Sequence, residues 1–186
     1  MKFIFSLIFG LFGLVLLVIP CLVISFLILI TSKGPVIHWS ERVGRNNVIF
    51  KMPKFRTMKV GSPQLETGLL EDVDSYLSLF GGFLRRTSLD ELPQIYSIIK
   101  GDMCFVGPRP ALFNQKELIA LRTLHNVDKL VPGLTGWAQI NGRDELSIAE
   151  KVALDVEYMS QKSFRFDMKI IVITLLKVIK RDGVVH

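Results

Sequence analysis

The run "FIFSLIFGLFGLVLLVIPCLVISFLILI", residues 3–30, contains no charged side chain and almost no polar one. It exceeds the about 20 apolar residues that a helix needs to cross a bilayer. It is too long for the apolar part of a signal peptide, and no cleavage site of small residues follows it. The run therefore predicts an N-terminal hydrophobic membrane helix over residues 1–32, followed by a second domain over residues 33–186.

The charges on the two sides of this run are unequal. Only one cation, Lys2, precedes the run. Seven cations and a single acidic residue, Glu41, follow it up to residue 59. Those cations are Lys33, Arg42, Arg45, Lys51, Lys54, Arg56 and Lys59. Because Lys and Arg near a membrane helix stay on the cytoplasmic side, the remainder of the chain is expected to face the cytoplasm.

Pro20 lies inside the hydrophobic run and leaves two arrangements open. A proline removes one helical hydrogen bond and clashes with the preceding turn, so the helix should kink there. The helix either spans the bilayer with a kink, or bends at Pro20 and returns to the cytoplasmic face. Hydropathy alone does not choose between these two arrangements.

The rest of the chain alternates short β-prone stretches with helical ones, which predicts an α+β fold that is mostly helical. Residues 34–40 and 48–52 are β-prone and flank turn residues, so they predict a short β-hairpin. A polar loop over 60–75 should lead into a short helix, and 131–143 is glycine-rich and irregular. Helices are expected over 93–100, 111–124, 147–160 and from about 167 onward. Ser147 and Glu150 form a capping box at the start of the third.

The last of these helices is strongly apolar, with a few lysines and arginines as its charges. Two interpretations fit: a core helix with one solvated edge, or an amphipathic helix lying in the membrane interface.

The net charge and the cysteine and histidine content limit the kinds of partner and metal site that the chain is expected to have. The net charge of +6 over 186 residues favours anionic partners: nucleic acid, phospholipid head groups or phosphorylated small molecules. The two cysteines lack CxxC spacing and the three histidines are scattered, so neither a zinc site nor a disulfide framework is expected.

Several cations stand beside glycine or proline, in segments that are not expected to be helical. Arg109 lies between two prolines in "GPRP", which restricts its backbone and lets the guanidinium be aimed with little loss of entropy. Guanidinium groups bind phosphate in a bidentate manner. The cations in such contexts are Lys54, Arg56, Arg85, Arg109 and Arg143, and together they predict a di- or polyphosphate site.

Two adjacent carboxylates, Asp90 and Glu91, follow "RRTSL" and have two interpretations. The first is a helix N-terminus, with Thr87 or Ser88 as the N-cap. The second starts the helix near Pro93 and leaves both carboxylates at its N-terminal end, among cations that keep them ionised. An ionised carboxylate there can bind Mg²⁺ together with substrate phosphates, or attack phosphorus as a nucleophile.

The chain resembles the bacterial sugar transferase family, the small monotopic phosphoglycosyl transferases. The matching stretches are "KGPVIHWSERVGRNNVIFKMPKFRTM", "LRRTSLDELPQIYSIIKGDMCFVGPRP", "VPGLTGWAQINGR" and "EKVALDVEYM". With the hydrophobic N-terminus they cover nearly the whole chain, and "SLDELPQ" in tandem with "GDMCFVGPRP" is highly specific.

The resemblance implies transfer of a sugar 1-phosphate from a UDP-sugar to a polyprenol phosphate, usually undecaprenyl phosphate, with release of UMP. By analogy with the family, Asp90 is the nucleophile, which forms a covalent phosphosugar and contacts Mg²⁺, and Glu91 deprotonates or positions the acceptor. Arg85, Arg109 and Arg143 are expected to contact phosphate or nucleotide, supported by Lys54 and Arg56. Asp155 matches a characteristic family acid and is expected in the substrate-binding set.

The resemblance also implies a monotopic, membrane-anchored domain in the bacterial cytoplasmic membrane, with a helix that is re-entrant at Pro20 and interfacial amphipathic helices. The catalytic domain then lies on the cytoplasmic face and works in the first membrane step of glycan or glycoconjugate assembly. The expected partners are UDP-sugar, polyprenol phosphate and membrane lipid, with downstream glycosyltransferases possible and no nucleic acid. The competing hypothesis is a non-catalytic membrane-surface scaffold of a glycan-assembly complex.

Overall fold

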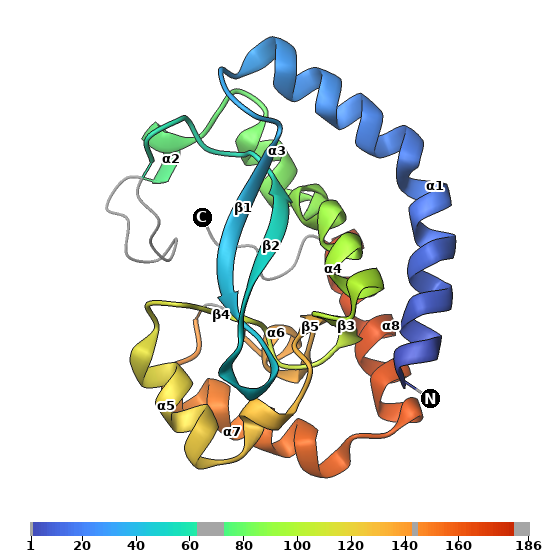
Figure 1. Ribbon diagram of the computed structural model, residues 1–186, viewed down its shortest axis with the longest axis vertical. Coiled ribbons are helices and arrows are strands. Elements are labelled where there is room, and N and C mark those ends of the chain that lie inside the picture. Colours follow the sequence, from blue (N-terminus) through green and yellow to red (C-terminus); the bar gives the residue numbers. More distant parts are fainter. Residues whose placement is uncertain (1, 63–72, 143–144, 181–186) are drawn as a thin grey trace.

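The computed structural model describes residues 2–62, 73–142 and 145–180, and helices dominate it (Figure 1). The mixed, mostly helical fold expected from the sequence is confirmed. The N-terminal half contains α1 (Lys2–Thr31), β1 (Ile37–Val43), η1 (Arg45–Asn47), β2 (Ile49–Phe55), α2 (Val73–Tyr76), α3 (Gly81–Arg86), η3 (Leu89–Gln94) and α4 (Ile95–Lys100). The C-terminal half contains β3 (Cys104–Val106), β4 (Ala111–Leu112), α5 (Lys116–Leu124), η4 (Val127–Lys129), β5 (Gly133–Thr135), α6 (Trp137–Ile140), α7 (Ile148–Gln161) and α8 (Phe164–Lys180).

Helix α1 runs along one edge of the molecule, bends partway and continues over the top (Figure 1). Pro20 lies inside it, and the helix is continuous across the proline. Ile24 and Ile28 on one side are buried in a core with Phe55 and Leu84, so the second half of α1 is anchored to β2 and α3. The side that faces away from this core is apolar and exposed, and comprises Val18, Ile19, Leu22, Val23, Phe26, Leu29 and Ile30.

In the part of the chain that the structure describes, no helix combines the length and the apolar character that crossing a membrane requires.

The predicted hairpin is confirmed, with β1 shifted three residues along the chain from the expected 34–40 and β2 extending three residues beyond the expected 48–52. Strands β1 and β2 pair antiparallel, with Val43 opposite Ile49 at the closed end and Ile37 opposite Phe55 at the open end. The turn fits its residue types, because Asn46 has a φ of 56° and asparagine tolerates the left-handed region. Strand β4 adds to the other edge of β1, and β3 pairs in parallel with β5.

Three expected elements have different bounds. Residues 111 and 112 form β4, so the helix expected over 111–124 begins only at Lys116. The segment expected to be irregular, 131–143, contains β5 and the short helix α6. The last helix begins at Phe164 rather than near Asp167, with the Ser163 hydroxyl oxygen accepting a hydrogen bond from the Phe166 N–H.

Helices α7 and α8 complete the C-terminal half. The capping box of α7 is confirmed, because Glu150 N–H donates to Ser147 Oγ and Ser147 N–H donates to Glu150 Oε2. Tyr158 of α7 and Ile170 of α8 are buried in one core with Val106 of β3. This core fixes the end of β3 immediately before the residues 107–110.

Candidate active site

The two adjacent carboxylates lie in η3, which begins four residues before Pro93. Ser88, the residue before η3, has a φ of 55° in the left-handed region and its side chain makes no capping hydrogen bond. The first interpretation is right in position, because Ser88 is the N-cap residue of η3 and both carboxylates lie in its first turn, but no capping box forms. The second is corrected, because the helical turn starts at Leu89 rather than near Pro93. The reason is packing, because Leu89 and Leu92 contact the core around Ile28 and their three-residue spacing matches a 3₁₀ turn.

Glu91 is held by two cations from distant parts of the chain. Its Oε1 accepts hydrogen bonds from Arg109 Nη2 at 2.9 Å and from Lys54 Nζ at 3.3 Å. The Glu91 side chain is 12% exposed, so both ion pairs are largely shielded from water. Burial lowers the pKa of Lys54, and the neighbouring Glu91 opposes that shift. These contacts bring Lys54 and Arg109 together at Glu91.

Asp90 is buried beside the same cations, but the residues that the structure describes donate no hydrogen bond to its carboxylate. Burial raises the pKa of Asp90, and the adjacent Glu91 raises it further. The nearby Lys54, Arg85 and Arg109 oppose this shift without cancelling it. Loss of hydration therefore outweighs the surrounding cations in setting the direction of this pKa shift.

Arg85 reaches this centre from α3. Its Nε donates a hydrogen bond to Thr57 Oγ1 at 3.0 Å, just after β2. Helix α3 lies close to that strand because Gly81 packs against the Thr57 carbonyl, where a Cβ would overlap the oxygen. Arg85 is thus fixed near Asp90, and its charge favours the ionised form of that carboxylate.

The remaining predicted site residues lie elsewhere or outside the described residues. The Arg56 guanidinium packs against Gly34, and its buried Nη1 donates no hydrogen bond to the described residues. Asp155 is 1% exposed and accepts two hydrogen bonds from Arg122, a residue that the sequence analysis did not single out. Arg143 lies outside the described residues.

The turn that carries Arg109, residues 107–110, is packed backbone to backbone against 131–136. Gly107 N–H donates to Thr135 O, and Gly133 N–H donates to Pro108 O, each at 2.9 Å. A Cβ at Gly107, Gly133 or Gly136 would overlap backbone atoms of the facing segment. These glycines are therefore needed for close approach, and they explain the glycine-rich composition of 131–136.

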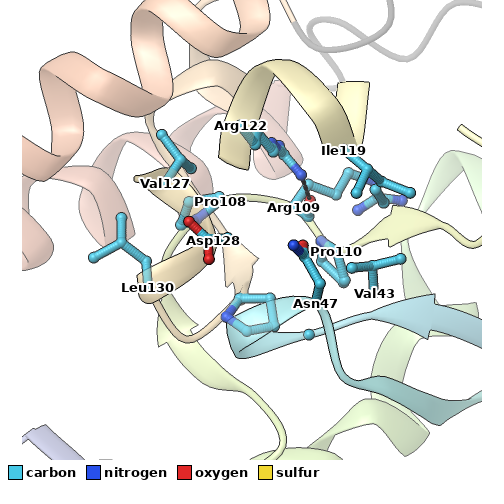
Figure 2. Close-up of a pocket in the computed structure, with 13 residues that line it drawn as sticks. Val43, Asn47, Pro108, Arg109, Pro110, Ile119, Arg122, Val127, Asp128 and Leu130 are labelled. Atoms are coloured by element: carbon cyan, nitrogen blue, oxygen red, sulfur yellow. Dashed lines mark hydrogen bonds between the residues drawn. The ribbon is translucent and has the colours of Figure 1, made fainter. Parts of the chain in front are cut away.

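A cavity of about 30 Å³ lies beside this turn (Figure 2). It is lined by Val43 and Asn47 of the hairpin end, by Ile119 and Arg122 of α5 and by Asp128 of η4, among others. Its lining includes Arg109 but neither Asp90 nor Glu91. A volume of this size accommodates about one water molecule.

Asp90 and Glu91 suit Mg²⁺ only if the substrate supplies the remaining ligands of the ion. Among the described residues, no three His, Cys, Asp or Glu side chains are grouped as a metal site. Asp90 accepts no hydrogen bond from those residues, so its oxygens remain available to a cation. Mg²⁺ is commonly bound by one or two carboxylates together with phosphate oxygens.

A buried carboxylate surrounded by Lys54, Arg85 and Arg109, beside a second carboxylate, defines a centre suited to phosphorylated substrates. The family described as "Bacterial sugar transferase" matches residues 1–181, and the chain belongs to this family. The resemblance inferred from "SLDELPQ" and "GDMCFVGPRP" is thereby confirmed.

Several similar proteins are named for a transferase activity or for polysaccharide production. The chain is 41% identical over 172 residues to the UDP-glucose:undecaprenyl-phosphate glucose-1-phosphate transferase of Escherichia coli, with 87% of this chain and 37% of that protein covered. It is 40% identical over 163 residues to the galactosyl transferase CpsE of Streptococcus agalactiae, with 81% and 36% covered. It is 36% identical over 169 residues to the exopolysaccharide production protein ExoY of Rhizobium meliloti, with 83% and 74% covered. The chain thus spans little more than a third of the first two relatives.

Proposed function

We propose that the protein transfers a sugar 1-phosphate from a UDP-sugar to undecaprenyl phosphate or a similar polyprenol phosphate, and releases UMP. The observation that carries this proposal is the buried Asp90 carboxylate, which lies next to a Glu91 that Lys54 and Arg109 hold in place. The activity for which the Escherichia coli relative is named is of this kind and supports the same donor and acceptor class.

The proposed reaction has two steps at one phosphorus atom. An Asp90 carboxylate oxygen attacks the sugar-bearing phosphorus of the UDP-sugar, and the bond to the UMP oxygen breaks with its electron pair leaving on UMP. A phosphate oxygen of the polyprenol phosphate then attacks the phosphorus of the Asp90 adduct. Glu91 accepts the proton of that phosphate, and the Asp90 carboxylate is released with the polyprenyl diphosphate sugar as product.

In this scheme the cations bind and orient the diphosphate. Arg85 and Arg109 are fixed by Thr57 and Glu91, so their guanidinium groups are preorganised for phosphate oxygens. Arg143 is proposed to add to them. Asp90, with the phosphate oxygens, would hold Mg²⁺, which would neutralise charge on the diphosphate and favour departure of UMP.

The first test is the identity of the released nucleotide. We expect the protein, incubated with undecaprenyl phosphate and each of a panel of UDP-sugars, to release UMP with one or a few of them. Nucleotides are separated by ion-pairing chromatography, and a reaction without lipid phosphate measures background hydrolysis. Release of UDP would contradict the proposal, because it would mean transfer of the sugar without its phosphate.

A second prediction concerns pH. Asp90 must be ionised to attack, and burial raises its pKa, so kcat/KM should fall as pH falls through a value above the about 3.9 of ordinary aspartate. Lys54→Met removes a cation that lowers this pKa, and should therefore move the acid limb to higher pH. The exposed Lys51→Met is the matched control and should not move it. A limb that stays in place in Lys54→Met would contradict this assignment.

A third prediction concerns the membrane. We propose that the exposed apolar side of α1 contacts lipid, because contiguous apolar surface of this kind marks an interaction site. We further propose that the helix is re-entrant at Pro20 in the bacterial cytoplasmic membrane, with the remainder of the chain on the cytoplasmic face. In a Cys21→Ser/Cys104→Ser background, Lys2→Cys should resist a membrane-impermeant maleimide in spheroplasts and react after permeabilisation. Labelling in intact spheroplasts would contradict the re-entrant arrangement.

A further inference from the structure

Arg122 connects three parts of the structure. Its Nε and Nη2 donate hydrogen bonds to Asp155 Oδ2 of α7 at 2.9 and 2.7 Å. Its Nη1 donates to the backbone oxygen of Arg109 at 2.8 Å. Figure 2 shows the Arg122 side chain directed at the Arg109 backbone. One guanidinium therefore joins α5, α7 and the turn that carries Arg109.

This ion pair is deeply buried, and burial alone does not make such a pair stabilising. The Arg122 and Asp155 side chains are 12% and 2% exposed. Burial raises the pKa of Asp155, while Arg122 opposes the shift. Because desolvation can offset the attraction within a buried pair, an apolar pair of similar volume is often equally stable. The third hydrogen bond, to Arg109, is what an apolar pair could not supply.

The turn can be held mainly through its carbonyl groups, because Pro108 and Pro110 have no backbone N–H. Side-chain donors from three elements bind the carbonyl oxygens of the turn or of the residue before it. Arg122 binds the Arg109 oxygen, Arg42 Nη1 donates to Pro110 O at 3.3 Å, and Tyr158 Oη donates to Val106 O at 2.9 Å. Asp155 and Tyr158 lie one turn apart on α7, so that helix holds the residue before the turn through Tyr158 and the Arg109 carbonyl through Arg122.

We infer that Arg122 and Asp155 are positioning residues that hold the Arg109 backbone so that its guanidinium meets Glu91. This inference rests on the proposed function for its consequence in catalysis. Arg122 orients the Arg109 carbonyl, and Asp155 orients Arg122 by accepting from two of its nitrogens. The Arg109 guanidinium then contacts Glu91 at 2.9 Å. Neither positioning residue needs to touch substrate.

The activity test is a double-mutant cycle with Arg109. Lysine keeps the charge of Arg122 but lacks the planar guanidinium that donates hydrogen bonds to Asp155 and to the Arg109 carbonyl at the same time. Arg122→Lys should lower kcat/KM for UMP release by about 10- to 100-fold, since small misplacements of a reacting group cost about that much. In an Arg109→Met background the same substitution should cost less than about 3-fold, because the group it positions is gone. The exposed Arg45→Lys is the control and should change neither background.

A stability readout keeps this inference separate from the proposed function. The coupling between Arg109 and Glu91 is measured from melting temperatures of Arg109→Met, Glu91→Gln and the double variant, with and without Arg122→Lys. We expect the coupling to be present with Arg122 and lost with lysine. If the unmodified protein releases no UMP with any UDP-sugar, the proposed function fails while this cycle still decides the inference.

Asp155→Asn provides a second route if Arg122→Lys does not fold. It keeps an acceptor oxygen and should show the same dependence on Arg109 with a smaller loss of activity. An equal loss in both Arg109 backgrounds, or an unchanged coupling between Arg109 and Glu91, would overturn the inference.

Discussion

Asp90→Asn should abolish turnover, lowering UMP release by at least about 10³-fold, because a neutral amide oxygen cannot replace a carboxylate as nucleophile. It should also abolish the covalent adduct. Incubated with the accepted UDP-sugar and no lipid phosphate, the unmodified protein should gain the mass of one sugar phosphate and release one equivalent of UMP. The asparagine variant should show neither in intact-protein mass spectrometry.

Loss of folding would not explain this result. Because burial raises the pKa of Asp90, its ionised form is disfavoured in the folded protein, and a neutral side chain of the same shape should not lower the melting temperature at neutral pH. Asp102→Asn is the matched control, since Asp102 pairs with the exposed Lys100. Robust turnover by Asp90→Asn would refute the assignment of Asp90 as the nucleophile.

The parts of the fold that were predicted correctly depend on local sequence. The hairpin follows from β-prone stretches on either side of a turn, and the α7 capping box from Ser147 and Glu150 three residues apart. Strands β4 and β5 were missed because each is two or three residues long and exists only through a distant partner. Such pairing leaves no periodic pattern in the strand itself.

The start of η3 shows how packing overrides a local signal. Proline is common in the first turn of a helix, so Pro93 favoured a helix that starts at that residue. Leu89 and Leu92 instead contact the core formed with α1, and this draws Asp90 and Glu91 into a helical turn behind a left-handed Ser88. The sequence singled out the acidic pair, but the backbone conformation of that pair depends on packing against the distant helix α1.

Arg122 could not be identified from the sequence for a related reason. It lies in an ordinary amphipathic helix, and its role depends on one carbonyl oxygen of Arg109 and one carboxylate of α7. The cations beside proline and glycine were easier to identify, because rigid backbone contexts are visible locally. Of these, the contacts with Glu91 place Lys54 and Arg109 together.

Glu91→Gln should separate the two chemical steps. Glutamine keeps a carbonyl oxygen for Arg109 and Lys54 but cannot accept a proton, so transfer to undecaprenyl phosphate should fall by about 10²- to 10⁴-fold. The first step needs only an ionised Asp90. Removing the negative charge of Glu91 lowers the pKa of Asp90, so the nucleophile stays ionised to lower pH. The adduct should therefore form and accumulate.

The measurement is a burst of UMP without acceptor, followed by a chase with undecaprenyl phosphate. Glu91→Gln should give a burst close to one equivalent and then a slow chase, whereas Asp90→Asn should give no burst. Glu41→Gln, an exposed glutamate on β1, should match the unmodified protein in both phases. A missing burst in Glu91→Gln would mean that Glu91 is needed in the first step. Its main role would then be to hold Arg109 and Lys54 in position for the donor diphosphate. A normal chase would remove it from acceptor activation altogether.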